Sequence, residues 1–88
     1  MASPLELLNL GPKSLAMLES AGVRSAEDVR RLGSVATFLK VRRSGARPSL
    51  NLLWALQGAI EGIPWQQVAV HHRTSLLLAL EQAERSDA

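Results

Sequence analysis

Apolar residues recur along the chain at helical spacing, and glycines and prolines divide this pattern into short segments. Val35, Phe38 and Leu39 follow the i, i+3, i+4 rule of an amphipathic helix, and no segment alternates with the period of two typical of a strand. Ser25 precedes one helical segment, and Asp28 three residues later completes an N-terminal capping box. The pattern predicts helical segments at 4–10, 12–20, 26–32, 35–43, 50–60 and 64–82.

Turn residues define the ends of these segments. Gly22, Gly33 and Gly62 stand where a left-handed residue ends a helix, and Ser34 is the expected N-cap of the segment after Gly33. The last segment either continues unbroken or restarts between residues 71 and 75. Residues 84–88 are expected to fray, as chain ends commonly do.

The segment 50–60 is apolar around most of its circumference, so we expect it to be central and buried. An 88-residue chain suits one domain with a modest core. The expected fold is therefore all-α: a compact bundle of five or six short helices, forming one domain over residues 1–88. Trp54 is expected in the core, with Asn51 bonded to a neighbouring helix end; the alternative is that the two form an exposed recognition pair. Trp65 is expected to seal a helix junction, the alternative being that it stacks on a base.

Several classes of chemistry are excluded by composition. The chain has no cysteine, which removes disulfides and thiol catalysis. His71 and His72 are adjacent, and neighbouring helical residues point about 100° apart, so we expect no metal site and no cofactor. No nucleophile with a plausible base and no phosphate-binding P-loop is found, so we expect no enzyme. Without a signal peptide or a membrane span, a cytoplasmic protein is expected.

Basic residues concentrate in the middle of the chain. The stretch 24–47 holds seven of the ten Lys and Arg residues and two of the eight Asp and Glu residues. It therefore carries a net charge of +5, which leaves −3 for the rest of the chain. Such asymmetry favours an anionic partner, although the same residues could simply solvate two surface helices. The seven cations are Arg24, Arg30, Arg31, Lys40, Arg42, Arg43 and Arg47.

The sequence Leu-Asn-Leu-Gly-Pro-Lys-Ser at 8–14 resembles the helix-hairpin-helix family of DNA-binding elements. In that family, two short helices flank a glycine–apolar–glycine hairpin whose backbone N–H groups approach a phosphate. Gly11 matches the second glycine, whereas Asn9 replaces the first. Asn tolerates a left-handed backbone conformation, so the turn can be kept. Lys13, in the first turn of the following helix, would place a cation beside the same phosphate.

A longer series of motifs resembles the C-terminal domain of the TfoX (Sxy) competence regulators. It runs from Leu-Gly-Pro-Lys-Ser at 10–14 through Ala-Gly-Val at 21–23 and Leu-Gly-Ser-Val at 32–35 to Ser-Leu-Asn-Leu-Leu-Trp-Ala-Leu at 49–56. This resemblance covers about residues 5 to 80. It implies a bacterial cytoplasmic protein linked to transcription and DNA uptake. The family's usual N-terminal domain is absent from this sequence, so we expect a stand-alone copy.

Two functions remain open. In the first, Asn9, Gly11 and Lys13 hold a DNA phosphate, and the seven cations of the stretch 24–47 add weak, salt-sensitive, sequence-neutral attraction. In the second, the same surface docks an acidic protein, or the domain self-associates. Fold alone does not choose between them, because one fold serves many functions.

Overall fold

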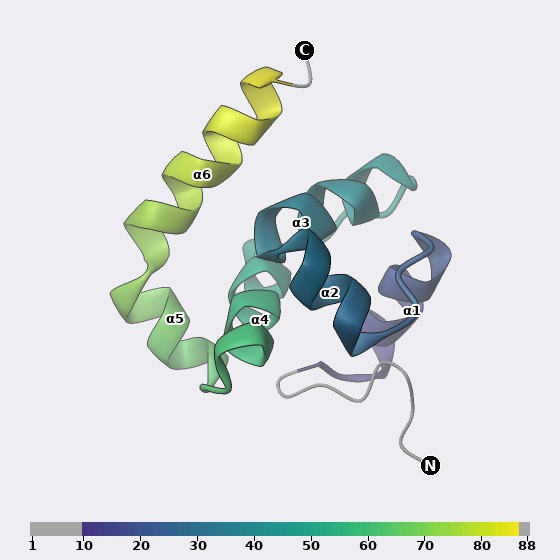
Figure 1. Cartoon of the computed structure of the whole chain (residues 1–88), viewed down its shortest axis with the longest axis horizontal. Coiled ribbons are helices and arrows are strands. Elements are labelled where there is room, and N and C mark those ends of the chain that lie inside the picture. The colour runs from purple at the N-terminus through teal and green to yellow at the C-terminus, as the bar shows by residue number, and fades with distance from the viewer. Residues whose placement is uncertain (1–9, 87–88) are drawn as a thin grey trace.

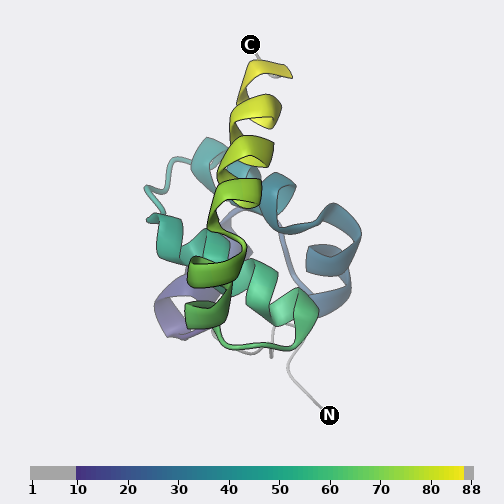
Figure 2. The same cartoon turned by 90° about the vertical axis from the view of Figure 1, so that its left-hand side faces the viewer.

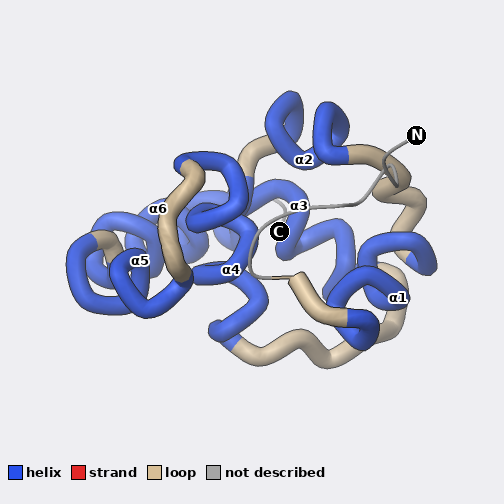
Figure 3. Tube along the Cα trace, turned by 90° about the horizontal axis from the view of Figure 1, so that it is seen from below, coloured by secondary structure: helices blue, strands red, loops and turns tan. Residues whose placement is uncertain are grey.

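The computed structural model describes residues 10–86, which form a bundle of short helices joined by loops (Figures 1 and 3). No strand occurs within this range, so the predicted all-α fold is confirmed. The helices are α1 (Pro12–Ser20), α2 (Ala26–Leu32), α3 (Ser34–Arg43), α4 (Leu50–Glu61), α5 (Trp65–His71) and α6 (Arg73–Ser86).

Five of the six predicted segments can be compared with these helices. The predicted helix at 4–10 lies outside the described residues except for Leu10, which is not helical. The last segment, for which we left two alternatives, is divided at His72 into α5 and α6. Residues 84–86, where we expected fraying, belong to the last turn of α6, and residues 87–88 lie outside the described range.

Helix α4 is at the centre of the bundle, as its apolar sequence predicted. It packs against α2, α3 and α5, while α3 also contacts α1 and α6 (Figure 1). Seven of its residues are buried, including Leu53, Trp54 and Leu56. Helix α6 lies along one side of the molecule, and its C-terminal end extends beyond the other helices (Figure 2). Helices α1 and α4 are therefore held in place by their contacts with the other helices.

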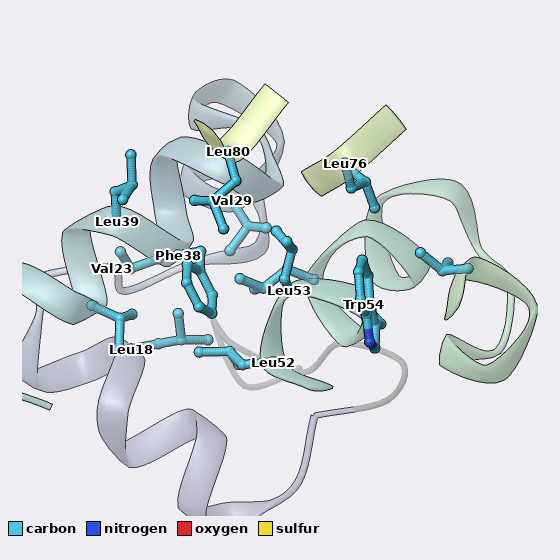
Figure 4. Close-up of a cluster of buried hydrophobic side chains, with 13 residues drawn as sticks. Leu18, Val23, Val29, Phe38, Leu39, Leu52, Leu53, Trp54, Leu76 and Leu80 are labelled. Atoms are coloured by element: carbon cyan, nitrogen blue, oxygen red, sulfur yellow. The ribbon is translucent and has the colours of Figure 1, made fainter. Parts of the chain in front are cut away.

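The core is built from one cluster of aliphatic side chains around Phe38 (Figure 4). Phe38 is 1% exposed and is surrounded by Leu18, Val23, Leu52 and Leu53. Burial of such side chains is the main favourable contribution to folding. Residues from α1 to α6 all contribute to this cluster, so it joins every described helix.

Helix ends follow the sequence signals in most places. The Ser25 hydroxyl accepts a hydrogen bond from the Asp28 N–H at 3.1 Å, which confirms the predicted N-cap of α2. The Asp28 carboxylate accepts from the N–H of Arg24, one residue before the N-cap. Gly62 ends α4 in the left-handed conformation, with φ 75° and ψ 30°.

The prediction that Ser34 is an N-cap is wrong. Gly33 is the N-cap of α3, and Ser34 is the first residue of that helix. The Ser34 side chain is buried, and its hydroxyl donates a hydrogen bond of 2.6 Å to the Gln57 side-chain oxygen. The side-chain nitrogen of Gln57 donates in turn to Glu61. Ser34 is therefore used to join α3 to α4, a role that depends on tertiary packing.

One buried hydroxyl of the core has no partner. Thr37 is fully buried on α3, and its Oγ1 makes no hydrogen bond. A buried polar group without a partner costs about 1–3 kcal/mol. Thr37→Val, which replaces the hydroxyl with a methyl group of similar shape, is therefore expected to raise the free energy of unfolding by about 1 kcal/mol.

Urea unfolding followed by circular dichroism measures this change. Thr74→Val on α6 is the matched control, because Thr74 is exposed and its hydroxyl is available to water. We expect the control to change stability by less than about 0.5 kcal/mol. A Thr37→Val variant less stable than the natural protein would contradict this assignment.

Candidate functional site

An open hollow of about 330 Å³ lies where the first turns of α1 and α4 meet the start of α5. We call it the α1–α4 groove. Its lining comes from four separate parts of the chain: α1, the loop before α4, α4 itself and α5. The polar residues of the lining are Lys13, Ser14, Arg47, Ser49 and Asn51, and the apolar ones are Met17, Pro48, Leu52, Ala55 and Trp65.

The polar side of the groove brings together two cations that are far apart in the sequence. Lys13 lies in the first turn of α1, and Arg47 lies in the loop before α4. Both side chains are exposed, and neither forms an ion pair with another described residue. Since no ion pair within the described range engages them, their charges remain available to an anion.

The N-terminal ends of α1 and α4 add partial positive charge to the same side. Gly11 is the N-cap of α1 and has no side chain to cap it, and the Ser49 side chain at the N-cap of α4 makes no capping hydrogen bond. Free N–H groups in the first turn of a helix favour negative charge nearby. The polar side of the groove is thus electropositive both from its side chains and from its backbone.

The apolar side of the groove is continuous with the core. Leu52 and Ala55 are buried on α4, whereas Met17 and Trp65 are partly buried and pack against the core cluster. Trp65 therefore packs at the α4–α5 junction, as we expected, and also lines the groove. The prediction that Trp54 belongs to the core is confirmed, since it is 3% exposed.

Asn51 differs from expectation. It is exposed on the first turn of α4 and lines the groove, and its side chain makes no hydrogen bond to a described residue. The expected bond to a neighbouring helix end is therefore absent from the described part of the chain. The Asn51 amide, which offers both a donor and an acceptor, faces the groove instead.

Two of the predicted cations are engaged within the molecule. The Arg42 guanidinium lies 5.0 Å from the centre of the Phe38 ring and is paired with Glu84 of α6. Arg31 pairs with Asp28 on its own helix at 3.1 Å. Arg42 thus joins α3 to α6, whereas the exposed Arg31 pair is of the kind that contributes little to stability.

The remaining predicted cations lie outside the groove. Arg24 lies in the loop after α1, two residues beyond Gly22. Lys40, on α3, is near the same turn, because a Cβ placed on Gly22 would lie 3.9 Å from Lys40 Cε. Arg30 is exposed on α2. Arg43 lines a second hollow, between α3 and α6, whose other lining residues are mainly apolar.

Only part of the predicted hairpin can be placed. Asn9 lies outside the described residues, while Gly11 is exposed at the start of α1 with an extended backbone. A Cβ placed on Gly11 would have no described atom within 4 Å. The backbone at Gly11 is therefore accessible to a partner.

Sequence reasoning missed Ser14 and Ser49 as members of a site with Lys13 and Arg47. For Asn51 it favoured a structural hydrogen bond over exposed recognition. A weak signal was present, because Pro12 and Pro48 each stand just before residues of the groove and mark two helix starts. That these starts are adjacent in space is a result of the bundle as a whole, in which α3 contacts both α1 and α4.

Across residues 10–86, no three histidine, aspartate or glutamate side chains gather as metal ligands would. Within that range, too, no helix has the length and apolar character needed to cross a membrane.

Two solved structures from Listeria monocytogenes share this fold. A protein of unknown function in a tetragonal crystal form is 27% identical, with a TM-score of 0.75 over 89% of this chain and 95% of that one. An uncharacterized protein in a triclinic form is 26% identical, with a TM-score of 0.79 over 94% of each chain. Comparison with functionally curated proteins gave no match.

The family comparison agrees with the motifs in the sequence. The model of the TfoX C-terminal domain matches residues 2–80, which include all the residues of the α1–α4 groove. This range runs from the N-terminal motif into α6, so it covers nearly the whole chain. The chain belongs to the TfoX C-terminal domain family.

Proposed function

We propose that this domain is a non-enzymatic regulatory module of the bacterial cytoplasm, linked to transcription or competence, that binds the phosphate backbone of DNA weakly and without reading its sequence. Membership of a family of regulatory-type domains supports the first part. The observation that carries the second part is that Lys13 and Arg47 line one groove. Two cations on one concave surface suit a phosphate, because each adds attraction while water is partly excluded.

The start of α1 strengthens this site. Gly11 leaves its backbone accessible, and the first turn of α1, which contains Lys13, has no side-chain cap for its N–H groups. Helix-hairpin-helix elements hold phosphate with these groups, and Asn9 would complete the hairpin in this chain. DNA is the partner class that presents such phosphates in a regular array.

The other cations extend the attraction beyond the groove. Lys40 lies near Gly22, Arg24 is exposed in the loop after α1, and Arg30 adds charge on α2. Arg31, Arg42 and Arg43 have partners within the protein, so we assign them a smaller share. Contacts of this kind position a protein on nucleic acid without giving sequence preference.

Lys13→Glu tests this function directly. It is expected to weaken binding to a short DNA duplex at low salt by about tenfold, and to reduce the slope of log affinity against log salt by about one. The reason is that the variant loses a phosphate contact and its counterion release. A fluorescence anisotropy titration at several salt concentrations measures both quantities.

The matched control is Arg73→Glu, which changes the charge by the same amount at an exposed residue that does not line the groove. We expect its effect on affinity to be less than about threefold, with both variants folded by circular dichroism. Equal losses in the two variants would show that only net charge matters. If the natural protein does not bind DNA but is larger than a monomer in solution, the domain is instead a protein-interaction module.

A further inference from the structure

The α1–α4 groove contains more than a phosphate requires. A phosphate group needs cations and N–H donors, which the polar side supplies, but half of the lining is apolar. Trp65, Leu52 and Ala55 belong to this second half, opposite in character to Lys13 and Arg47. A ligand that uses both halves carries a negative charge at one end and a flat, apolar group at the other.

We propose that the groove binds one nucleotide of an unpaired nucleic-acid strand, with its phosphate at Lys13 and Arg47 and its base against Trp65. This inference rests on the proposed function, because it takes the nucleic-acid backbone as the partner and specifies the form of strand. A hollow of about 330 Å³ is within the range of small-ligand sites, which is large enough for one nucleotide.

The chemistry favours an unpaired strand over a duplex. In a duplex the bases are stacked and paired, so their faces are not available to an aromatic side chain. In a single strand each base can leave the stack and lie on a tryptophan while the backbone follows a positive groove. Trp65 and the two cations provide this combination in one place.

The polar rim of the groove fits a site with little base preference. Asn51 lies on the rim with its amide unbonded to any described residue, and Ser14 and Ser49 carry hydroxyls that are both donors and acceptors. Such groups can bond to the edge of any base. We therefore expect strand form, rather than sequence, to determine affinity.

The test compares three probes of ten nucleotides per strand: a thymidine strand, the same deoxyribose-phosphate strand without bases, and a duplex. The two single strands carry equal charge, and affinity for the duplex is compared per phosphate because it has two backbones. The thymidine strand is expected to bind the natural protein at least tenfold more tightly than the abasic strand, because only it can stack. The chain has two tryptophans, and Trp54 is buried in the core. In a Trp54→Phe protein, fluorescence quenching on binding therefore reports contact with Trp65.

Variants at Trp65 separate stacking from attraction to phosphate. Trp65→Leu is expected to bind the thymidine strand about tenfold more weakly and the duplex unchanged, whereas Trp65→Phe recovers most of the loss. Asn51→Ala, at an exposed position, gives a further check should Trp65→Leu fail to fold, with a smaller loss expected for the thymidine strand alone.

The outcomes distinguish this inference from the proposed function. Equal binding of the thymidine and abasic strands, or a duplex that binds as tightly as the single strand without quenching Trp65, overturns the inference and leaves backbone binding intact. Absence of binding to all three probes at low salt overturns both.

Discussion

Phe38→Ala is expected to lower the free energy of unfolding by about 3–5 kcal/mol, the largest loss among the substitutions considered for this domain. Phe38 is the largest fully buried side chain and lies in the middle of the core (Figure 4). Its removal takes away contacts with Leu18 and Leu53 and leaves a cavity that the surrounding helices fill only in part. A small domain is commonly stable by about 5–15 kcal/mol, so this loss is a large share of the total.

The substitution also removes the surface on which Arg42 rests. The Arg42 guanidinium lies over the Phe38 ring, and such a contact contributes about 0.5–1 kcal/mol where it is exposed to solvent. Arg42→Ala alone should therefore cost much less than Phe38→Ala.

Chemical denaturation followed by circular dichroism measures these differences. Leu78→Ala on α6 is the control for removal of an apolar side chain, because Leu78 is 55% exposed. We expect the control to cost less than about 1 kcal/mol. Similar losses at Phe38 and Leu78 would be inconsistent with a core centred on Phe38.

The positions of the helices could be predicted because their signals are local. Glycine and proline act on the backbone of their own residue, so Gly22, Gly62 and Pro12 mark helix ends whatever the rest of the chain does. The apolar residues around most of the circumference of α4 likewise predicted its central place, because such a helix is stable only when most of its surface is buried. These properties belong to single segments and are visible in the sequence.

The roles of individual polar residues could not be predicted in this way. Ser34 has the sequence position of a cap but bonds to Gln57 on another helix. Arg42 belongs to the most basic run of the chain but is paired with Glu84, which is distant in sequence. Both partners are brought close only by packing of α3 against α4 and α6. A local pattern therefore gives the residue type at such a position, and tertiary contacts decide its use.

In the candidate site, too, the residue types are visible in the sequence, while their arrangement depends on tertiary contacts. Sequence charge singled out a long basic stretch, and the structure separates its members among the groove, the Gly22 turn, the α3–α6 hollow and internal ion pairs. Lys13 and Arg47 come together because the first turn of α1 packs near the start of α4. The groove is thus a product of the fold, and its apolar half is the exposed edge of the core.

The geometry at Gly33 leads to the second large effect expected. Gly33→Ala is expected to lower the free energy of unfolding by about 2–3 kcal/mol. Gly33 has φ 86° and ψ 164°, a conformation that is essentially limited to glycine, because a Cβ there collides with its own backbone. It is also the only residue between α2 and α3, so no loop is available to absorb a change. Relaxing its backbone would move Ser34 away from Gln57.

Gly62→Ala provides the comparison, since Gly62 also has a positive φ but with ψ 30°. That left-handed helical region is reached by other residues at about 1 kcal/mol, and asparagine reaches it most easily. We therefore expect Gly62→Ala to cost about 1 kcal/mol and Gly62→Asn less, whereas Gly33→Asn should be as harmful as Gly33→Ala.

Denaturant unfolding of the four variants tests this order. At either glycine, an added Cβ has no described atom within 4 Å other than those of its own residue and its two chain neighbours. Differences in stability therefore report backbone conformation alone. Should Gly33→Asn be tolerated as well as Gly62→Asn, the connection between α2 and α3 would have to adopt an ordinary left-handed turn, and the packing of Ser34 against α4 would need another explanation.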